Sequence, residues 1–306
     1  MATVGRPSEM SWQEAVDAFL AAKRGENLSA STIDNYAWHL TGTRAETFLR
    51  DHGIRSPRQL TAEALEGLQS ELLDAGVSPA LAHAFHRVWK NFAGFCIRRG
   101  YGAAPEVLAV KAPKQPMREP ETFSVEEERR MMAAARAPRD RLIMELLLRT
   151  GLRLEELCSL RLDDIVDGPE GAYLRVRQGK GAKDRIVPLD TPRVKLSRTL
   201  RQYIAHVRPT DTDSPMLFIS ERRRGGGYEG MTRRSVQLMM RRLSDATGIH
   251  IHPHKFRHTF ATRSLAAGVD VMALQRVLGH TTLAMVSRYV HYQRHDLIAA
   301  WNKRRD

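Results

Sequence analysis

Cysteine and long apolar stretches are both scarce in this chain. Only two of the 306 residues are cysteines, Cys96 and Cys158, too few for the disulfide framework of a small secreted domain. No apolar run is long enough to cross a bilayer, and the N-terminus MATVGRPSEMSWQEA lacks the apolar stretch of a secretory signal. We therefore expect a soluble protein of a reducing compartment, the cytoplasm, with no membrane partner.

Acidic residues are outnumbered. The chain has 48 Lys and Arg against 35 Asp and Glu, a formal net charge of +13. Residues 1–112 carry 12 of each sign, whereas residues 113–306 carry 36 basic and 23 acidic residues, so the whole excess lies in the second part. Charge alone leaves an anionic membrane surface or plain solubility open. A nucleic-acid backbone is nevertheless the partner that such a surface favours most.

The length predicts two domains, and the first of them, residues 1–112, has the pattern of a helical bundle. Its last helix is the clearest, because Ser78 and Pro79 form a typical helix start and Gly100 a typical end. Apolar residues at helical spacing predict four helices, over about residues 12–24, 29–50, 61–74 and 78–100. Residues 113–121 follow as a linker, since prolines and charges forbid a continuous helix there.

The second domain, residues 122–306, is predicted to be mainly helical with a small β-hairpin or sheet. Ser124 and Glu127 form a capping-box pattern, and an apolar helix ends at Gly151, directly before a short helix. The segments AYLRVRQ and RIVPL alternate or run extended on either side of GKGAKD, as in a β-hairpin. The tract RRRGGG at 222–227 is typical of a solvated loop, and the chain otherwise returns to helices.

Two basic residues lie at positions suited to hold a ligand. Arg153 follows the glycine break in TGLRLEEL at the start of a helix, where Glu156 could hold its guanidinium. Lys180 lies at the hairpin tip between glycines, and a long mobile ammonium there could reach a DNA backbone and protonate a leaving oxygen. Lys183 competes for that role. Each residue taken alone is typical of an ordinary solvated surface.

A histidine-rich segment, HPHKFRHTFATRSLAAG, places His254 and Arg257 three residues apart on one helical face, so both could meet one phosphate. The cluster of His250, His252, His254 and His258 also permits a metal interpretation, since the last two have the spacing of paired zinc ligands on a helix. No cysteine and no obvious carboxylate accompanies them, and we expect no metal site.

The last motif, LGHTTLAMVSRYVHY, presents His280 after a turn and Tyr289 nine residues later. An isolated tyrosine is most often a packing residue, and Tyr292 is a rival by proximity. It is the ordered set TGLR, GKG, HxxR, LGH and this tyrosine that singles out Tyr289. In this order and spacing the chain resembles the tyrosine recombinase or phage integrase family, especially its Xer-like members.

The resemblance implies a helical, SAM-like core-binding domain that clamps DNA, followed by a catalytic domain whose C-terminal tail helix docks either locally or on a neighbouring protomer. It implies that six residues surround and attack the scissile phosphate, with Glu156 supporting the first arginine: Arg153, Lys180, His254, Arg257, His280 and Tyr289. It further implies a 3′-phosphotyrosyl intermediate that needs no cofactor, neither ATP nor metal. Strand exchange would take place in a homotetramer on a double-stranded recombination site, with or without a partner recombinase or accessory factors.

The residue types suit this reaction. Two arginines can meet the charge that builds on nonbridging oxygens, and an imidazole such as that of His254 can take the phenolic proton of Tyr289. Lys180 would protonate the departing 5′ oxygen, while His280 would donate to a phosphate oxygen. A type IB topoisomerase-like relaxing enzyme would use the same groups, and a non-catalytic DNA-binding regulator would share the charge.

Overall fold

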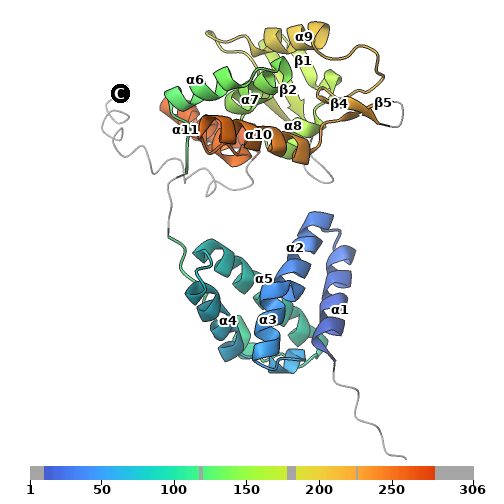
Figure 1. Cartoon of the computed structure of the whole chain (residues 1–306), viewed down its shortest axis with the longest axis vertical. Helices are drawn as coiled ribbons and strands as arrows, with labels where there is room; N and C mark the ends of the chain where they lie inside the picture. Colours follow the sequence, from blue (N-terminus) through green and yellow to red (C-terminus); the bar gives the residue numbers. More distant parts are fainter. Residues whose placement is uncertain (1–9, 117–119, 178–183, 225–226, 280–306) are drawn as a thin grey trace, which may run out of the picture. The chain divides into compact units, whose positions relative to one another are not determined.

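The computed structural model describes residues 10–116, 120–177, 184–224 and 227–279 (Figure 1). The chain forms two compact units, Met1–Arg118 and Glu119–Asp306, each with its own apolar core. Among the helices within the described ranges, none is both long and apolar enough to span a bilayer.

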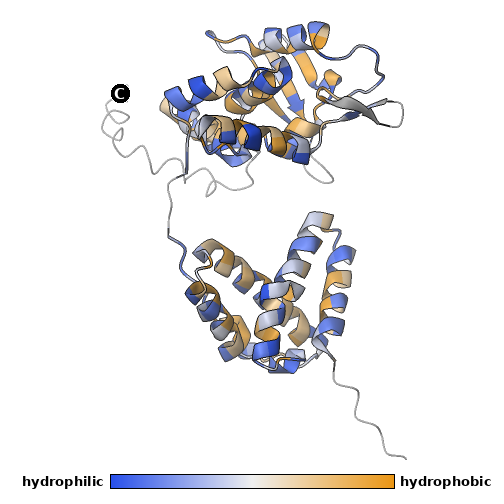
Figure 2. Ribbon diagram, in the orientation of Figure 1, coloured by the Kyte–Doolittle hydropathy of each residue, from blue (hydrophilic) through white to orange (hydrophobic). Residues whose placement is uncertain are grey.

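The first unit is helical throughout its described part. Its aromatic core is built around the longest helix, in which Phe85, Trp89 and Phe92 are fully buried. Serine and threonine side chains cap four of the helices by accepting a backbone N–H in the first turn, and the cap predicted at Ser78 is one of them. The helices are α1 (Trp12–Gly25), α2 (Ala30–Thr41), α3 (Thr43–Asp51), α4 (Ala62–Asp74) and α5 (Pro79–Arg99), with short 3₁₀ turns at Pro57–Gln59 and Pro105–Ala109. In Figure 2 they carry both apolar and hydrophilic residues, as amphipathic helices do.

One helix predicted over residues 29–50 is in fact two. Gly42 separates α2 from α3, because its backbone is extended at φ −76° and ψ 163° and so interrupts the helix. A β-carbon at Gly42 would lie 2.4 Å from the carbonyl oxygen of Trp38. The break therefore depends on glycine at this position, which apolar periodicity alone did not reveal.

The second unit packs helices against a small antiparallel sheet. Its helices are α6 (Val125–Ala134), α7 (Pro138–Thr150), α8 (Leu154–Ser159), α9 (Leu196–His206), α10 (Arg233–Thr247), α11 (Pro253–Ala266) and α12 (Val271–Leu278), with a 3₁₀ turn at Leu162–Asp164. Strands β1 (Ile165–Gly168), β2 (Gly171–Val176) and β3 (Arg185–Pro188) form one sheet in that order. The predicted hairpin is confirmed, since β2 and β3 pair with Val176 opposite Arg185.

The arginine–glycine tract is not simply a loop. Residues Ile219–Arg224 form β4 and Gly227–Gly230 form β5, and the two strands pair antiparallel. Arginine and glycine have little strand preference, so the sequence pattern gave no sign of this second hairpin. Here backbone pairing across the strands outweighs local preference.

Helix α7 is the centre of the second unit. Its apolar face is fully buried at Ile143, Met144, Leu146 and Leu147. Helix α11 and helix α9 pack on α7, and α12 packs on both α11 and β3. This packing brings the end of α7, the start of α8, β3, α11 and the end of α12 to one place.

Candidate active site

The site begins at the C-terminal end of α7, where Gly151 adopts a left-handed conformation at φ +61°. A β-carbon on Gly151 would lie 2.4 Å from Phe260 Cδ1 and 2.9 Å from Leu278 Cδ2. Helices α11 and α12 therefore approach the end of α7 so closely that only glycine fits. The chain leaves this turn directly into Arg153, which precedes α8.

Arg153 and Glu156 hold one another at the start of α8. The backbone N–H of Arg153 donates to Glu156 Oε2 at 2.7 Å, and Arg153 Nη1 donates to Oε1 at 2.9 Å. The contact that the sequence suggested is thus present. The Glu156 side chain is only 13% exposed, whereas that of Arg153 is 40% exposed and can still meet a ligand.

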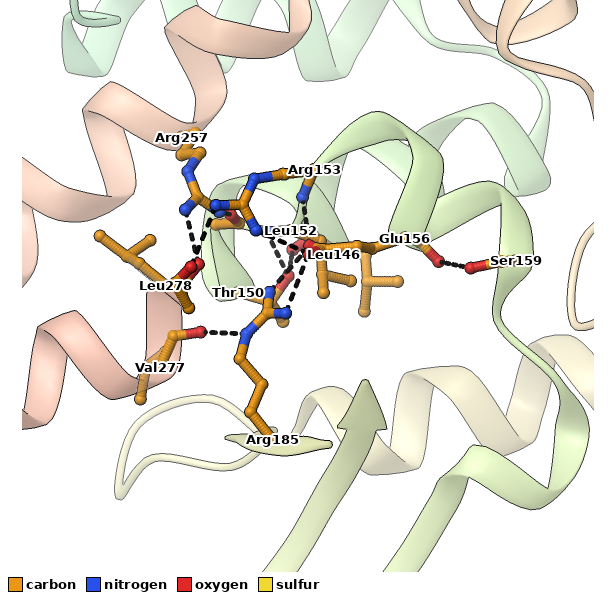
Figure 3. A network of polar contacts seen from close by, with 12 residues as sticks. Leu146, Thr150, Leu152, Arg153, Glu156, Ser159, Arg185, Arg257, Val277 and Leu278 are labelled. Carbon is orange, nitrogen blue, oxygen red and sulfur yellow. Dashed lines mark hydrogen bonds and ion pairs between the residues drawn. The ribbon is translucent and has the colours of Figure 1, made fainter. Parts of the chain in front are cut away.

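Arg257 reaches the same place from α11. It is 5% exposed, and it donates from Nη1 to the carbonyl of Gly151 at 2.7 Å and from Nη2 to that of Leu278 at 2.6 Å. Arg153 Nη2 donates to the next carbonyl, that of Gly279, at 3.2 Å. Because the two guanidiniums bind carbonyls of adjacent residues, they lie side by side, as Figure 3 shows.

A third arginine, Arg185, belongs to the cluster and was missed by the sequence reasoning. It donates from Nη1 and Nη2 to the two oxygens of Glu156 at 2.9 and 2.8 Å, and from Nε to the carbonyl of Val277 at 2.7 Å (Figure 3). A signal was available in the alternation of β3. Arg185 lies two residues before Val187, so it shares the buried face of that strand.

The positive charges of the site are balanced by two kinds of acceptor, the Glu156 carboxylate and the carbonyls at the end of α12. Burial by itself would raise the pKa of the Glu156 carboxyl, but hydrogen bonds from Arg185 and the Arg153 backbone, with the charge of Arg185, lower it to about 2. Glu156 is therefore an anion at neutral pH. The C-terminal carbonyls of α12 add the negative end of a helix dipole. Together they offset the repulsion between three neighbouring guanidiniums, of which Arg153 remains 40% exposed and open to an anionic ligand.

Of the remaining predicted site residues, the structure describes only His254. His254 is exposed in the first turn of α11, one turn before Arg257, and its ring centroid lies 6.3 Å from that of His258. Lys180, His280 and Tyr289 lie outside the described residues, as do the rivals Lys183 and Tyr292. In sequence, Lys180 falls in the connection between β2 and β3, and His280 directly follows Gly279.

Comparison with known protein families identifies the family to which this chain belongs. The model described as "Phage integrase family" matches residues 121–295, more than half of the chain. This chain belongs to the phage integrase family. Two curated relatives of this chain are tyrosine recombinases. XerC of Shewanella amazonensis is 32% identical over 92% of this chain and 91% of its own length. XerA of Pyrococcus furiosus is 34% identical over 72% of this chain and 79% of its own length.

The fold of the family member is similar to that of a solved lambda integrase, a tetramer bound to a Holliday junction. The TM-score is 0.69 at 21% identity, with 89% of this chain and 78% of that chain covered. The predicted Xer-like tyrosine recombinase family, the mainly helical fold with a small antiparallel sheet and the enzyme class of a site-specific recombinase are therefore confirmed. The relatives favour this activity over a relaxing enzyme or a non-catalytic regulator.

Proposed function

We propose that this recombinase cuts and rejoins DNA through a 3′-phosphotyrosyl bond at Tyr289. The observation that carries the proposal is the pair of guanidiniums of Arg153 and Arg257, held on the adjacent carbonyls of Gly279 and Leu278. Two fixed arginines side by side match the nonbridging oxygens of one phosphate. The next residue in sequence is His280, so this clamp lies at the start of the segment that contains Tyr289.

In the proposed reaction, the Tyr289 oxygen attacks phosphorus and the bond from phosphorus to the 5′ oxygen breaks. His254 takes the phenolic proton, and Lys180 gives a proton to the departing oxygen. Arg153, Arg257 and His280 stabilise the negative charge that builds on the nonbridging oxygens. The reverse reaction, with a 5′ hydroxyl from another strand, rejoins the backbone without ATP or metal.

Glu156 is a positioning residue in this scheme. Its carboxylate contacts Arg153 and Arg185 but is largely covered, so it orients the first arginine and does not itself meet the phosphate. Arg185 has the same supporting role, because it joins Glu156 to the end of α12. The arrangement fixes Arg153 before DNA binds.

The proposed partners are a double-stranded recombination site and three further copies of the chain. A tetramer is supported by the lambda integrase structure of similar fold, which is a tetramer on a Holliday junction. Residues 1–112 would close on DNA as the core-binding domain, 113–121 would link it, and 122–306 would be the catalytic domain with its tail helix. A cytoplasmic location goes with this activity, since the substrate is cellular DNA.

The proposal is tested by trapping the covalent intermediate. Wild-type protein is incubated with a library of nicked genomic fragments. Protein–DNA adducts that resist denaturation are recovered, their protein is digested with protease, and the attached DNA ends are sequenced. Tyr289→Phe should form no adduct, whereas Tyr292→Phe should form the wild-type amount. Adducts that persist in Tyr289→Phe would overturn the assignment.

A matched pair tests the arginine clamp in the same assay. Arg153→Ala should reduce adduct formation at least about 100-fold, the usual effect of losing one donor to a developing oxyanion. Arg149→Ala, an exposed residue of α7 four positions earlier, is the control and should cleave normally. Relaxation of any supercoiled plasmid without site preference would instead favour a topoisomerase-like enzyme.

A further inference from the structure

Three potential metal ligands that are far apart in sequence meet at the beginning of the second unit. His250 Nδ1 lies 3.5 Å from Glu121 Oε2, and His252 Nε2 lies 3.9 Å from the same oxygen. The two imidazole rings lie 4.6 Å apart between their centroids. One ligand atom from each residue lies within 4.8 Å of the other two.

The local backbone explains why the two imidazoles share one side. His250 and His252 flank Ile251, which is 5% exposed and points into the core. His252 has extended backbone, at φ −148° and ψ 156°. Alternate residues of an extended segment lie on the same face, so burying Ile251 turns both histidines outward together.

The carboxylate comes from a segment whose position is fixed independently. Phe123, two residues after Glu121, is 3% exposed. Its backbone N–H donates to Thr259 Oγ1 at 2.9 Å, and its carbonyl accepts from Arg263 Nη2 at 3.1 Å. Both partners belong to α11, which begins directly after His252. Glu121 is therefore brought to the histidines by contacts that do not involve the cluster.

We propose that Glu121, His250 and His252 form a binding site for a divalent transition-metal ion, for which Zn²⁺ is the probe. Two imidazoles and a carboxylate are a common zinc ligand set, with water in the fourth position. At metal–ligand distances of about 2.0–2.1 Å, tetrahedral ligand atoms lie about 3.3 Å apart. The observed separations of 3.5 and 3.9 Å to Glu121 come within small side-chain rotations of that value.

Ion pairing between Glu121 and the histidines would not by itself stabilise this cluster strongly. The side chains of Glu121 and His250 are 62% and 73% exposed, and an ion pair so open to water contributes little to stability. A metal ion would instead tie the segment before Phe123 to the loop that precedes His254. The segment from His250 to His258 contains no carboxylate, and the fold supplies one from 129 residues earlier than His250.

The test measures zinc binding by metal-free full-length protein without DNA, so that it is independent of the recombinase proposal. Zinc affinity is obtained by competition with a chromophoric chelator, and Co²⁺ absorption reports the geometry. Glu121→Gln, His250→Asn and His252→Asn should each lose one bound equivalent or weaken it about 100-fold. His206→Asn, an exposed histidine of α9, is the matched control and should bind as wild type.

Thermal unfolding gives a second measurement of the same site. Zinc at about 100 times its dissociation constant should raise the melting temperature of the second unit by about 5–10 °C in wild type and in His206→Asn. The shift should be absent from Glu121→Gln. A zinc isotherm and a melting shift in Glu121→Gln or His250→Asn that equal those of wild type would overturn the proposal.

Discussion

Replacing Glu156 by glutamine removes the carboxylate that holds Arg153 and Arg185 together. Glutamine has nearly the same shape and keeps one acceptor oxygen, but its amide group would face guanidinium donors. Arg185 would then be left as a cation whose side chain is only 7% exposed. We therefore expect Glu156→Gln to destabilise the second unit strongly and to release Arg153 from its fixed orientation.

The expected loss of stability is about 3 kcal/mol or more. A pKa lowered from 4.5 to about 2 corresponds to roughly 3 kcal/mol of stability at neutral pH. Removing one partner of a buried ion pair usually costs about 3–5 kcal/mol. Since the folded-state pKa is depressed, this contribution is fully present above pH 4.5 and is lost as the pH falls toward 2. The difference between wild type and Glu156→Gln should shrink over that range.

Urea unfolding of the full chain can locate the effect. Three of the four tryptophans belong to the first unit: Trp12, Trp38 and Trp89. The urea midpoint of the main fluorescence transition should therefore be the same in wild type and in Glu156→Gln. The helical signal in circular dichroism follows both units. In Glu156→Gln, the urea midpoint of the dichroism transition that reports the second unit should fall by about 1 M or more.

Glu155→Gln is the matched control. The Glu155 side chain is 68% exposed and pairs with Arg233, itself 53% exposed, so its loss should change stability by no more than about 0.5 kcal/mol. Equal urea midpoints for Glu155→Gln and Glu156→Gln would contradict the reasoning, as would a fluorescence transition that moves with the dichroism.

Three further predictions concern the glycine turn, acid stability and salt. Gly151→Ala should cost at least about 3 kcal/mol in urea unfolding because its β-carbon collides with Phe260. Gly248→Ala, also left-handed at φ +69° but with open space around it, should cost only about 1–2 kcal/mol, and equal losses would refute the steric argument. Burial lowers the pKa values of His39 and His86, so the unfolded state takes up protons first. The urea midpoint of the first unit, followed by tryptophan fluorescence, should therefore fall as the pH drops below 6.5. A midpoint independent of pH would contradict this. DNA affinity should fall steeply and linearly on logarithmic axes with salt concentration; a flat response would contradict the charge argument.

Local signals made much of the fold predictable. Helix caps such as Ser78, and glycine ends such as Gly100 and Gly151, are determined by neighbouring backbone groups, so they can be recognised in sequence. The contact between Arg153 and Glu156 is equally local, one helical turn long. What the pattern missed was the break at Gly42 and the pairing of β4 with β5, where backbone geometry outweighs side-chain periodicity.

The site was only partly predictable because much of it is long-range. The chain order of motifs pointed to Arg153 and Arg257, but nothing near either residue indicates that both bind the end of α12. The alternation of β3 places Arg185 on the buried face, but its partner Glu156 lies 29 residues earlier and no local pattern indicates it. Glu121 resembled one more linker charge, and its approach to His250 depends on Phe123 docking against α11.

The site can assemble only late in synthesis of the chain. Each of its three arginines binds a different carbonyl near the end of α12, those of Val277, Leu278 and Gly279. During synthesis, Arg153, Arg185 and Arg257 leave the ribosome before the acceptors that bring them together. A nascent chain that ends before Val277 therefore has most of its basic residues but lacks the acceptors that, under the proposed function, order the arginines for a phosphate. Under the proposed function, competence to cleave DNA is therefore acquired only after the chain has been synthesised as far as these acceptors.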